Sequence, residues 1–109
     1  MKTIAEALAA LPYPCCHPPY RGGADKYITY QLLGQSGVLY AEGCEAETAV
    51  GYMVHLWCAG SGVYDLLRQV KPLLEAAGYI VTVDVEIYEK EARLHRIVLT
   101  ANTEGAVYG

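Results

Sequence analysis

Basic residues are few in this sequence: its 109 residues include eight Lys and Arg, and the formal net charge is −4. These residues are scattered, whereas a protein that binds nucleic acid through its phosphates presents a cluster of basic side chains. Long apolar runs are also missing, because no stretch approaches the roughly 18 apolar residues of a membrane-spanning helix. The composition therefore argues against a nucleic-acid partner and against a membrane partner.

Motifs for metal, nucleotide or nucleophilic chemistry are missing as well. The sharpest local cluster is Cys15-Cys16-His17, but no CxxC or HxxxH spacing supplies further metal ligands, and nothing local activates a thiolate. The glycine-rich stretches 34–37 and 60–62 lack the Lys of a P-loop and the dinucleotide-binding spacing. We therefore predict no catalytic residue, no cofactor and no metal site, and a protein that is not an enzyme. A metal ion bound at this cluster would need two more ligands, which would come from Cys44, Cys58, His55 or His95.

Phe is absent, and the aromatic residues are ten Tyr and one Trp. Tyr joins an apolar ring to a polar tip, which suits interfaces and half-exposed sheets equally well. Hydrophobic residues make up 53% of the chain and charged residues 18%. A chain this short has little interior, so we expect one domain (1–109) that places part of its apolar surface in subunit contacts. The alternative is a monomer with an apolar loop.

Hydrophobic periodicity predicts two helices and four main strands. An N-terminal helix (1–11) leads into an extended Pro-rich crossing (12–26), which includes a short edge strand around Cys15–His17. The β-β-α-β-β core (27–101) and a tail (102–109) follow. The order α-β-β-α-β-β predicts an α+β fold, a mainly antiparallel four-stranded sheet with two helices on one face. The expected core elements are strands at 27–33, 49–58, 79–88 and 94–101, a helix at 61–77, and a connection at 34–48.

The apolar patterns of the second helix and of its neighbouring strands predict how the core packs. Ser61 is the expected N-cap, and a wide apolar stripe along the helix should lie on the sheet. Pro72 predicts a kink, because proline lacks the backbone donor and clashes with the preceding turn. Alternating apolar residues should face this helix from the strands; they are Val54, Leu56, Val81, Val83, Val85 and Ile87.

Two regions are candidate interaction surfaces. The connection 34–48 is long for a hairpin in a small domain, and such loops are commonly functional. The strand at 49–58 carries unusually bulky side chains on the face that points away from the core, and its histidine is a candidate pH-sensitive group. We predict that both regions contact a partner through Val38, Leu39, Tyr40, Glu42, Glu45 and Glu47 of the connection and Met53, His55 and Trp57 of the strand.

The whole pattern resembles a known family. Its most specific parts are the strand YITYQ (27–31), the strand YMVHLWC (52–58), and a helix that closes on LLEAAGY (73–79) before another strand. Over residues 3–101 the chain is similar to the small tail-completion and tail-terminator proteins of long-tailed bacteriophages, which lie at the head–tail joint. The Cys15-Cys16-His17 cluster and Pro72 depart from that family's pattern.

The resemblance implies a structural protein of the virion neck, assembled in the cytoplasm of the host bacterium. It would form a ring with itself, often a hexamer in proteins of this kind, cap the tail tube protein, and join it to the head connector or adaptor. A ring subunit needs two different lateral patches, because head-to-tail contacts are heterologous. The alternative is a small bacterial ligand-binding or regulatory α+β module that dimerises through its sheet. A third interpretation is an enzyme that uses Cys15 or Cys16 with a histidine.

Overall fold

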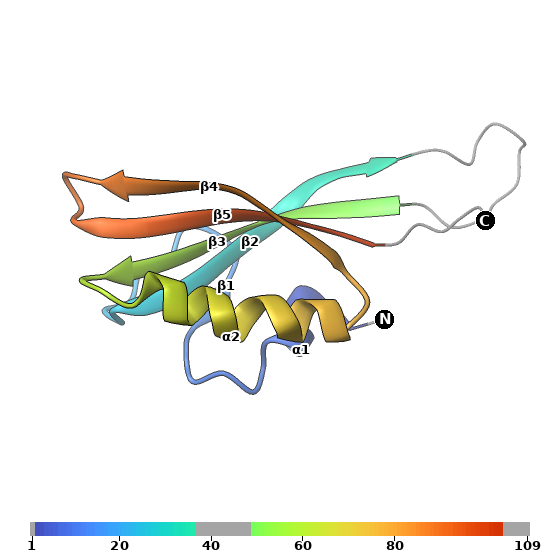
Figure 1. The fold of residues 1–109 in the computed structure, drawn as a ribbon, viewed down its shortest axis with the longest axis horizontal. Coiled ribbons are helices and arrows are strands. Elements are labelled where there is room, and N and C mark those ends of the chain that lie inside the picture. Colours follow the sequence, from blue (N-terminus) through green and yellow to red (C-terminus); the bar gives the residue numbers. More distant parts are fainter. Residues whose placement is uncertain (1, 37–48, 104–109) are drawn as a thin grey trace, which may run out of the picture.

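The protein folds as an α+β domain, as the element order predicts. The computed structural model describes residues 2–36 and 49–103. Figure 1 shows both helices on the same side of one five-stranded sheet, whose strand order is β1-β2-β3-β5-β4. The elements in chain order are α1 (Ile4–Ala7), β1 (Cys15–Cys16), β2 (Lys26–Ser36), β3 (Ala49–Ala59), α2 (Val63–Ala76), β4 (Ile80–Glu89) and β5 (Leu94–Asn102).

The sheet is mixed and has one strand more than the four-stranded prediction. The four long strands pair antiparallel, but β1 pairs parallel with β2, placing Cys15 beside Ile28 and Cys16 beside Thr29. The backbone N–H of Ile28 also donates to the carbonyl oxygen of Pro14, at 2.9 Å. Prolines on both sides limit β1 to two residues, because proline cannot donate to a strand ladder.

Helix α1 is shorter than the predicted 1–11. Thr3 caps it, and its hydroxyl accepts from the backbone N–H of Glu6 while the Glu6 carboxylate accepts from that of Thr3. After four residues the chain turns, and the N–H of Leu11 bonds the carbonyl oxygen of Leu8 at 3.1 Å. Leu8 is buried and Leu11 packs against the core.

Helix α2 is the longest described helix, at 14 residues, and it continues through Pro72. Its N-cap is Gly62, at φ +111°, and the predicted cap Ser61 makes no side-chain bond to the helix. A left-handed backbone at the cap position suits glycine, which explains why Gly62 replaces Ser61 there. Within the described ranges, no helix combines the length and apolar character that crossing a membrane requires.

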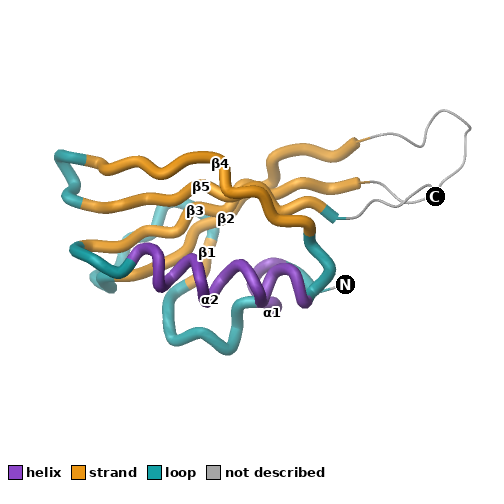
Figure 2. The backbone as a smooth tube through the Cα atoms, in the orientation of Figure 1, coloured by secondary structure: helices purple, strands orange, loops and turns teal. Residues whose placement is uncertain are grey.

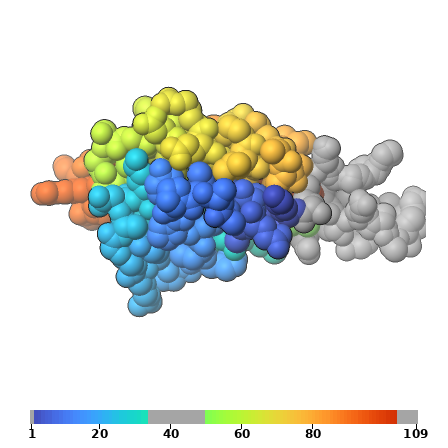
Figure 3. Space-filling view, turned by 90° about the horizontal axis from the view of Figure 1, so that it is seen from below, coloured from blue at the N-terminus to red at the C-terminus, as the bar shows by residue number. Residues whose placement is uncertain are grey.

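The core lies between the helices and the centre of the sheet. Figure 3 views the molecule from the helix side, where α1 (blue) and α2 (yellow) lie next to each other over the sheet. Val54 and Leu56 are fully buried, as predicted. The largest buried side chains come from both helices and from β2, β3 and β5; they are Ile4, Leu8, Ile28, Leu56, Leu66, Leu74, Ile97 and Leu99.

Strand β4 corrects the predicted alternation. Its pairing with β5 shifts between Val83 and Val85, so Asp84 is an extra residue that forms a β-bulge. Beyond this bulge Val85 and Ile87 pair with Val98 and Arg96, on the sheet face opposite the helices, rather than facing α2. Val83 lies before the bulge but is 45% exposed, since β4 is the outermost strand. A one-residue insertion reverses the facing of every later side chain.

Candidate functional site

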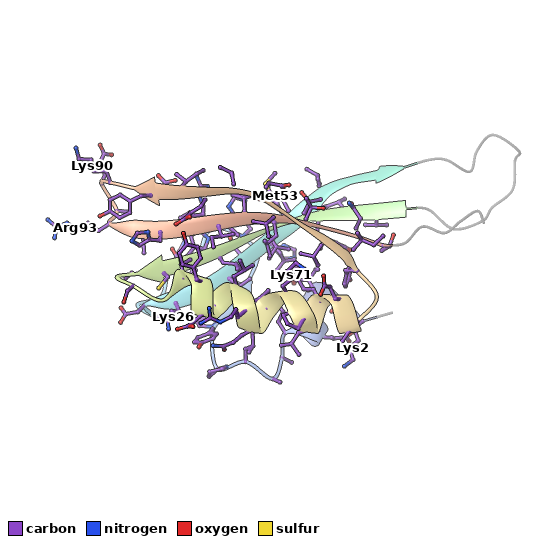
Figure 4. The ribbon with its side chains drawn as sticks, viewed as in Figure 1. Lys2, Lys26, Met53, Lys71, Lys90 and Arg93 are labelled. Atoms are coloured by element: carbon purple, nitrogen blue, oxygen red, sulfur yellow. The ribbon has the colours of Figure 1, made fainter. Side chains whose placement is uncertain are left out.

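The candidate site is the face of the sheet that no described helix covers. In Figure 2 both helices lie below the sheet, and Figure 4 shows Met53 on its upper side. We call this surface the open face; it includes Tyr27, Thr29, Gln31, Met53, His55, Trp57, Val85, Ile87, Glu89, Arg96, Val98 and Thr100. The structure therefore places three of the predicted interface residues together, half-buried, in the middle of this surface: Met53, His55 and Trp57.

A row of aromatic rings crosses the open face. The ring of Tyr20, from the segment before β2, stacks on Tyr27 with 4.1 Å between centroids. Tyr27 stacks beside Trp57 at 5.7 Å, and Trp57 beside His55 at 5.9 Å. The last two pairs are within 15° of parallel. Offset stacking of this kind stabilises aromatic pairs beyond the area they bury.

Trp57 is fixed at the centre of this row. Its indole Nε1–H donates to the Thr29 hydroxyl at 3.0 Å, and the Arg96 guanidinium lies 5.0 Å from the ring centroid. Such a distance is within the range of a cation–π interaction. Trp57 and its neighbours cover Thr29, so this polar residue is buried although no described helix packs on this face of the sheet. The result is a preformed aromatic surface above a buried, hydrogen-bonded Thr29.

Arg96 links the aromatic row to strand β4. Its Nη2 donates to the Glu89 carboxylate at 2.5 Å, and its Nη1 lies 3.4 Å from His55 Nδ1. Arginine can only donate, so Nδ1 is the acceptor and the neutral imidazole carries its proton on Nε2. Burial and the positive charge of Arg96 both lower the pKa of His55. The open face thus holds a neutral histidine beside a charge-paired arginine.

Sequence reasoning missed Arg96, Glu89 and Tyr20 as members of this surface. Arg96 alternates with Val98 and Thr100 along β5, and that period of two marks one face of a strand. The alternation does not say which β3 residues lie opposite, since register arises from the pairing of distant strands. Tyr20 lies outside any strand, so no periodicity indicates its position.

The thiol cluster does not form a joint site. Cys15 and Cys16 are neighbours on a strand, so their side chains point to opposite faces of the sheet. Cys15 packs against the core, and burial, followed by the neighbouring Cys16, raises its pKa to about 11. Cys58 is buried and its Sγ bonds the carbonyl oxygen of Ser61 at 3.2 Å. Over the described ranges no three His, Cys, Asp or Glu residues are grouped as metal ligands, and Cys15, Cys16 and Cys58 are free.

A small pocket of about 200 Å³ lies at the N-terminal end of α2. It is lined by the turn Gly60–Gly62, by Val63 and Tyr64 of α2, and by Glu86 and His95 of the sheet. The Tyr64 hydroxyl donates to the Glu86 carboxylate at 2.5 Å, and this hydrogen bond raises the pKa of Tyr64. The bond forms because the bulge at Asp84 turns Glu86 to the helix side of the sheet.

The remaining predicted interface residues belong to the connection between β2 and β3. Because β2 extends to Ser36, that connection begins three residues later than predicted. Val38, Leu39, Tyr40, Glu42, Glu45 and Glu47 lie outside the described residues. Their role stays a prediction, as does that of Met53, His55 and Trp57.

Comparisons with known proteins give no relative for this chain. No protein-family model matches it, and no curated protein and no solved structure matches it either.

Proposed function

We propose that this chain is a structural subunit of a bacteriophage neck. It acts as a tail-terminator or tail-completion protein, forms a ring with copies of itself, caps the tail tube and joins it to the head connector. Its place would be the virion neck, after assembly in the cytoplasm of the host bacterium. The proposal rests on the resemblance of the sequence pattern over residues 3–101 to that family, and the open face is the observation that supports it.

The open face supports a docking role because its centre is aromatic and preformed and no described helix covers it. Trp57 and Tyr27 hold their stacking through one hydrogen bond and one cation–π contact, so they lose little side-chain freedom on binding. Aromatic residues and arginine are enriched where protein interfaces gain most of their binding energy. Met53 adds a flexible apolar side chain beside them, which adapts well to a partner surface.

The aromatic row also has a simpler interpretation. Large side chains that lie flat can shield an exposed sheet and stabilise the monomer, and the burial of Thr29 shows that they do shield it. A docking role adds a testable consequence that shielding lacks: a surface substitution on this face should block assembly without lowering stability.

Met53→Lys provides this test. Met53 makes none of the hydrogen bonds or ring contacts of the row, so the charge should leave the fold intact while opposing an apolar contact. The matched control is Tyr64→Lys, an exposed residue of α2 on the other side of the sheet. In phage particles carrying each variant, electron microscopy should show unjoined heads and tails with Met53→Lys and joined particles with Tyr64→Lys.

An amber mutation in the gene tests the function itself. We expect filled heads and separate tails in the lysate, and portal, head and tail genes in the flanking DNA. Complete virions from the amber mutant would refute the neck assignment, whatever the behaviour of the point variants.

The pocket at the start of α2 favours the alternative, a ligand-binding module that acts as a dimer. Its lining combines a glycine turn with Glu86 and His95, which could orient a small polar ligand. Native mass spectrometry separates the two proposals, because a ring supports the neck subunit and a dimer supports the module. Ligand retained in the purified dimer would decide for the module.

A further inference from the structure

Strand β4 forms a free edge of the sheet. Among the described strands it pairs only with β5, and Figure 1 shows it at the rim, with no strand on its outer side. The opposite edge differs, because β1 borders β2 at Ile28 and Thr29, and His17 Nδ1 donates to the carbonyl oxygen of Tyr30 at 3.0 Å. A free edge offers its backbone N–H and C=O groups to an added strand.

Beyond its bulge, β4 presents different chemistry on its two faces. Val85 and Ile87 point to the open face, and Val85 is 45% exposed. Glu86 and Tyr88 point to the helix side, where Tyr88 is 52% exposed and its ring centroid lies 4.8 Å from that of His95. The side chains of an added strand alternate between the same two faces and lie beside those of β4. The edge therefore discriminates between strands by what they place on each face.

The carboxylate of Glu86 carries a negative charge that no described basic side chain pairs. The ion pairs among the described residues involve other acids; they are Arg68–Asp65, Lys71–Glu75 and Arg96–Glu89. Glu86 is exposed and accepts a hydrogen bond from the hydroxyl of Tyr64, which is a neutral donor. A Lys or Arg side chain on an added strand would supply the missing charge, and cross-strand pairs of opposite charge stabilise a sheet.

The surroundings of Glu86 suit a basic side chain in two further ways. The pocket of about 200 Å³ is lined by Glu86, Tyr64 and His95, so it has space for the end of a long side chain. The exposed ring of Tyr88 lies next along the same face, and a cation over such a ring is attracted by its π electrons. Basic residues therefore fit beside both Glu86 and Tyr88, while apolar residues fit beside Val85 and Ile87 on the other face.

A second copy of this chain is a poor occupant for this edge. Its own β4 would bring Asp84, Glu86 and Glu89 and no basic residue, and like charges side by side destabilise a strand pair. None of the other described strands alternates apolar with basic residues. The occupant that fits is therefore a segment of a different protein.

The bulge and the acidic residues also have a protective role. Natural edge strands use both devices to prevent indiscriminate pairing, and the bulge at Asp84 limits the regular part of the edge to the residues after it. This protection acts against apolar and acidic strands. A basic strand gains from the same charges, so protection and selective binding are compatible.

We propose that the edge of β4 at Val85–Tyr88 binds an extended segment of a different protein by strand addition. That segment alternates apolar residues, which lie beside Val85 and Ile87, with Lys or Arg residues, which lie beside Glu86 and Tyr88. The inference goes beyond the proposed function and does not depend on it, because the edge is the same in a neck subunit and in a ligand-binding module.

A synthetic peptide with this alternation provides the probe. Fluorescein-labelled Thr-Val-Lys-Val-Lys-Val-Thr, blocked at both ends, is titrated with the protein, and fluorescence anisotropy should give a Kd below about 1 mM. With the probe in excess, backbone amide hydrogen exchange should slow in Val85–Tyr88 and stay unchanged in β2. The control peptide Thr-Lys-Lys-Val-Val-Val-Thr has the same composition without the alternation, and it should bind at least about tenfold more weakly.

Reversing one charge gives the decisive result. Glu86→Lys should bind the probe at least about tenfold more weakly than the native chain does, and should instead bind a peptide in which Glu replaces both Lys residues. Glu86 is exposed, so this variant should keep its fold, which circular dichroism and thermal melting will check. The matched control is Glu75→Lys, which makes the same change of net charge near the other end of α2 and should leave the binding of both peptides unchanged.

Other outcomes overturn the proposal. They are absence of probe binding up to about 1 mM, equal affinity of the native chain and Glu86→Lys for the probe, and slowed exchange outside β4 only. A native dimer whose β4 amides are protected without any peptide would make a second copy the occupant. If Glu86→Lys unfolds, Glu86→Gln takes its place; it should weaken probe binding about threefold, and an unchanged affinity would overturn the role of Glu86.

Discussion

Leu66 and Leu67 are adjacent in α2, and the sequence pattern places both on the apolar stripe of that helix. The structure separates them: Leu66 is 0% exposed and belongs to the central core, whereas Leu67 is half-buried at its margin. Replacing each by alanine therefore tests the orientation of the helix on the sheet.

The expected magnitude follows from the buried groups. Leu66→Ala removes three carbon groups from full burial, at about 0.8 kcal/mol each, or about 2.4 kcal/mol of transfer free energy. The cavity left between α2 and the sheet adds to this, since such cores relax only in part, and we expect a total loss of about 3–4 kcal/mol. Leu67→Ala should cost about half as much, because part of its side chain already meets solvent.

Urea unfolding followed by circular dichroism measures both losses. With a native stability of about 5–15 kcal/mol, the Leu66→Ala protein should remain folded in water but melt at least about 10 °C lower. The slope of the urea transition should not change, so that the shift in midpoint reports stability alone. If Leu66→Ala lowers the free energy of unfolding by less than about 0.5 kcal/mol, or by no more than Leu67→Ala does, then α2 packs on the sheet through a different face.

Three further predictions concern other parts of the chain. The pKa of His55 is lowered in the folded protein, so its neutral form contributes stability above the unfolded pKa of about 6.5, and this contribution is lost as the pH falls below that value. His55→Gln should therefore reduce the fall in stability between about pH 7 and about pH 5. Parallel curves of stability against pH for the two proteins would contradict this. All four cysteines should stay reduced and bind no stoichiometric metal. About one zinc per chain by elemental analysis, with unfolding in chelator, would instead indicate a metal site at Cys15-Cys16-His17. Replacing Val38–Tyr40 by Ser-Gly-Ser should leave the melting temperature nearly unchanged and block ring formation or tail joining, and either normal assembly or unfolding would show that these residues are not a docking element.

Much of the fold was predictable because its elements are local patterns. In the strand of Val54 and Leu56 apolar residues recur every second position, and in α2 they recur about every 3.6 positions. Each spacing depends only on which face of that one element is buried away from water. For the same reason the sequence indicated that Met53, His55 and Trp57 share one face of their strand. Those expectations needed no knowledge of the neighbouring strands.

Other features depend on contacts between residues far apart in the chain. The bulge at Asp84, which turns Val85 and Ile87 to the open face, arises in the pairing of β4 with β5, and the Asp84 carboxylate there accepts from the Thr100 hydroxyl at 2.5 Å. Arg96 reaches His55 and Glu89 only because β5 lies between β3 and β4. Strand order and register are set by pairing across the sheet, and no single strand encodes them.

The sequence by itself determined the α+β class, the order of the two helices and the four long strands, most of the core and one face of the central strand. Only the tertiary structure decided that β1 adds a parallel edge, that Trp57 lies between Tyr27 and Arg96, and that Val85 and Ile87 point to the open face. The physical reason is that the periodicity of apolar residues belongs to a single segment of the chain, whereas strand order and register arise only when strands pair with one another.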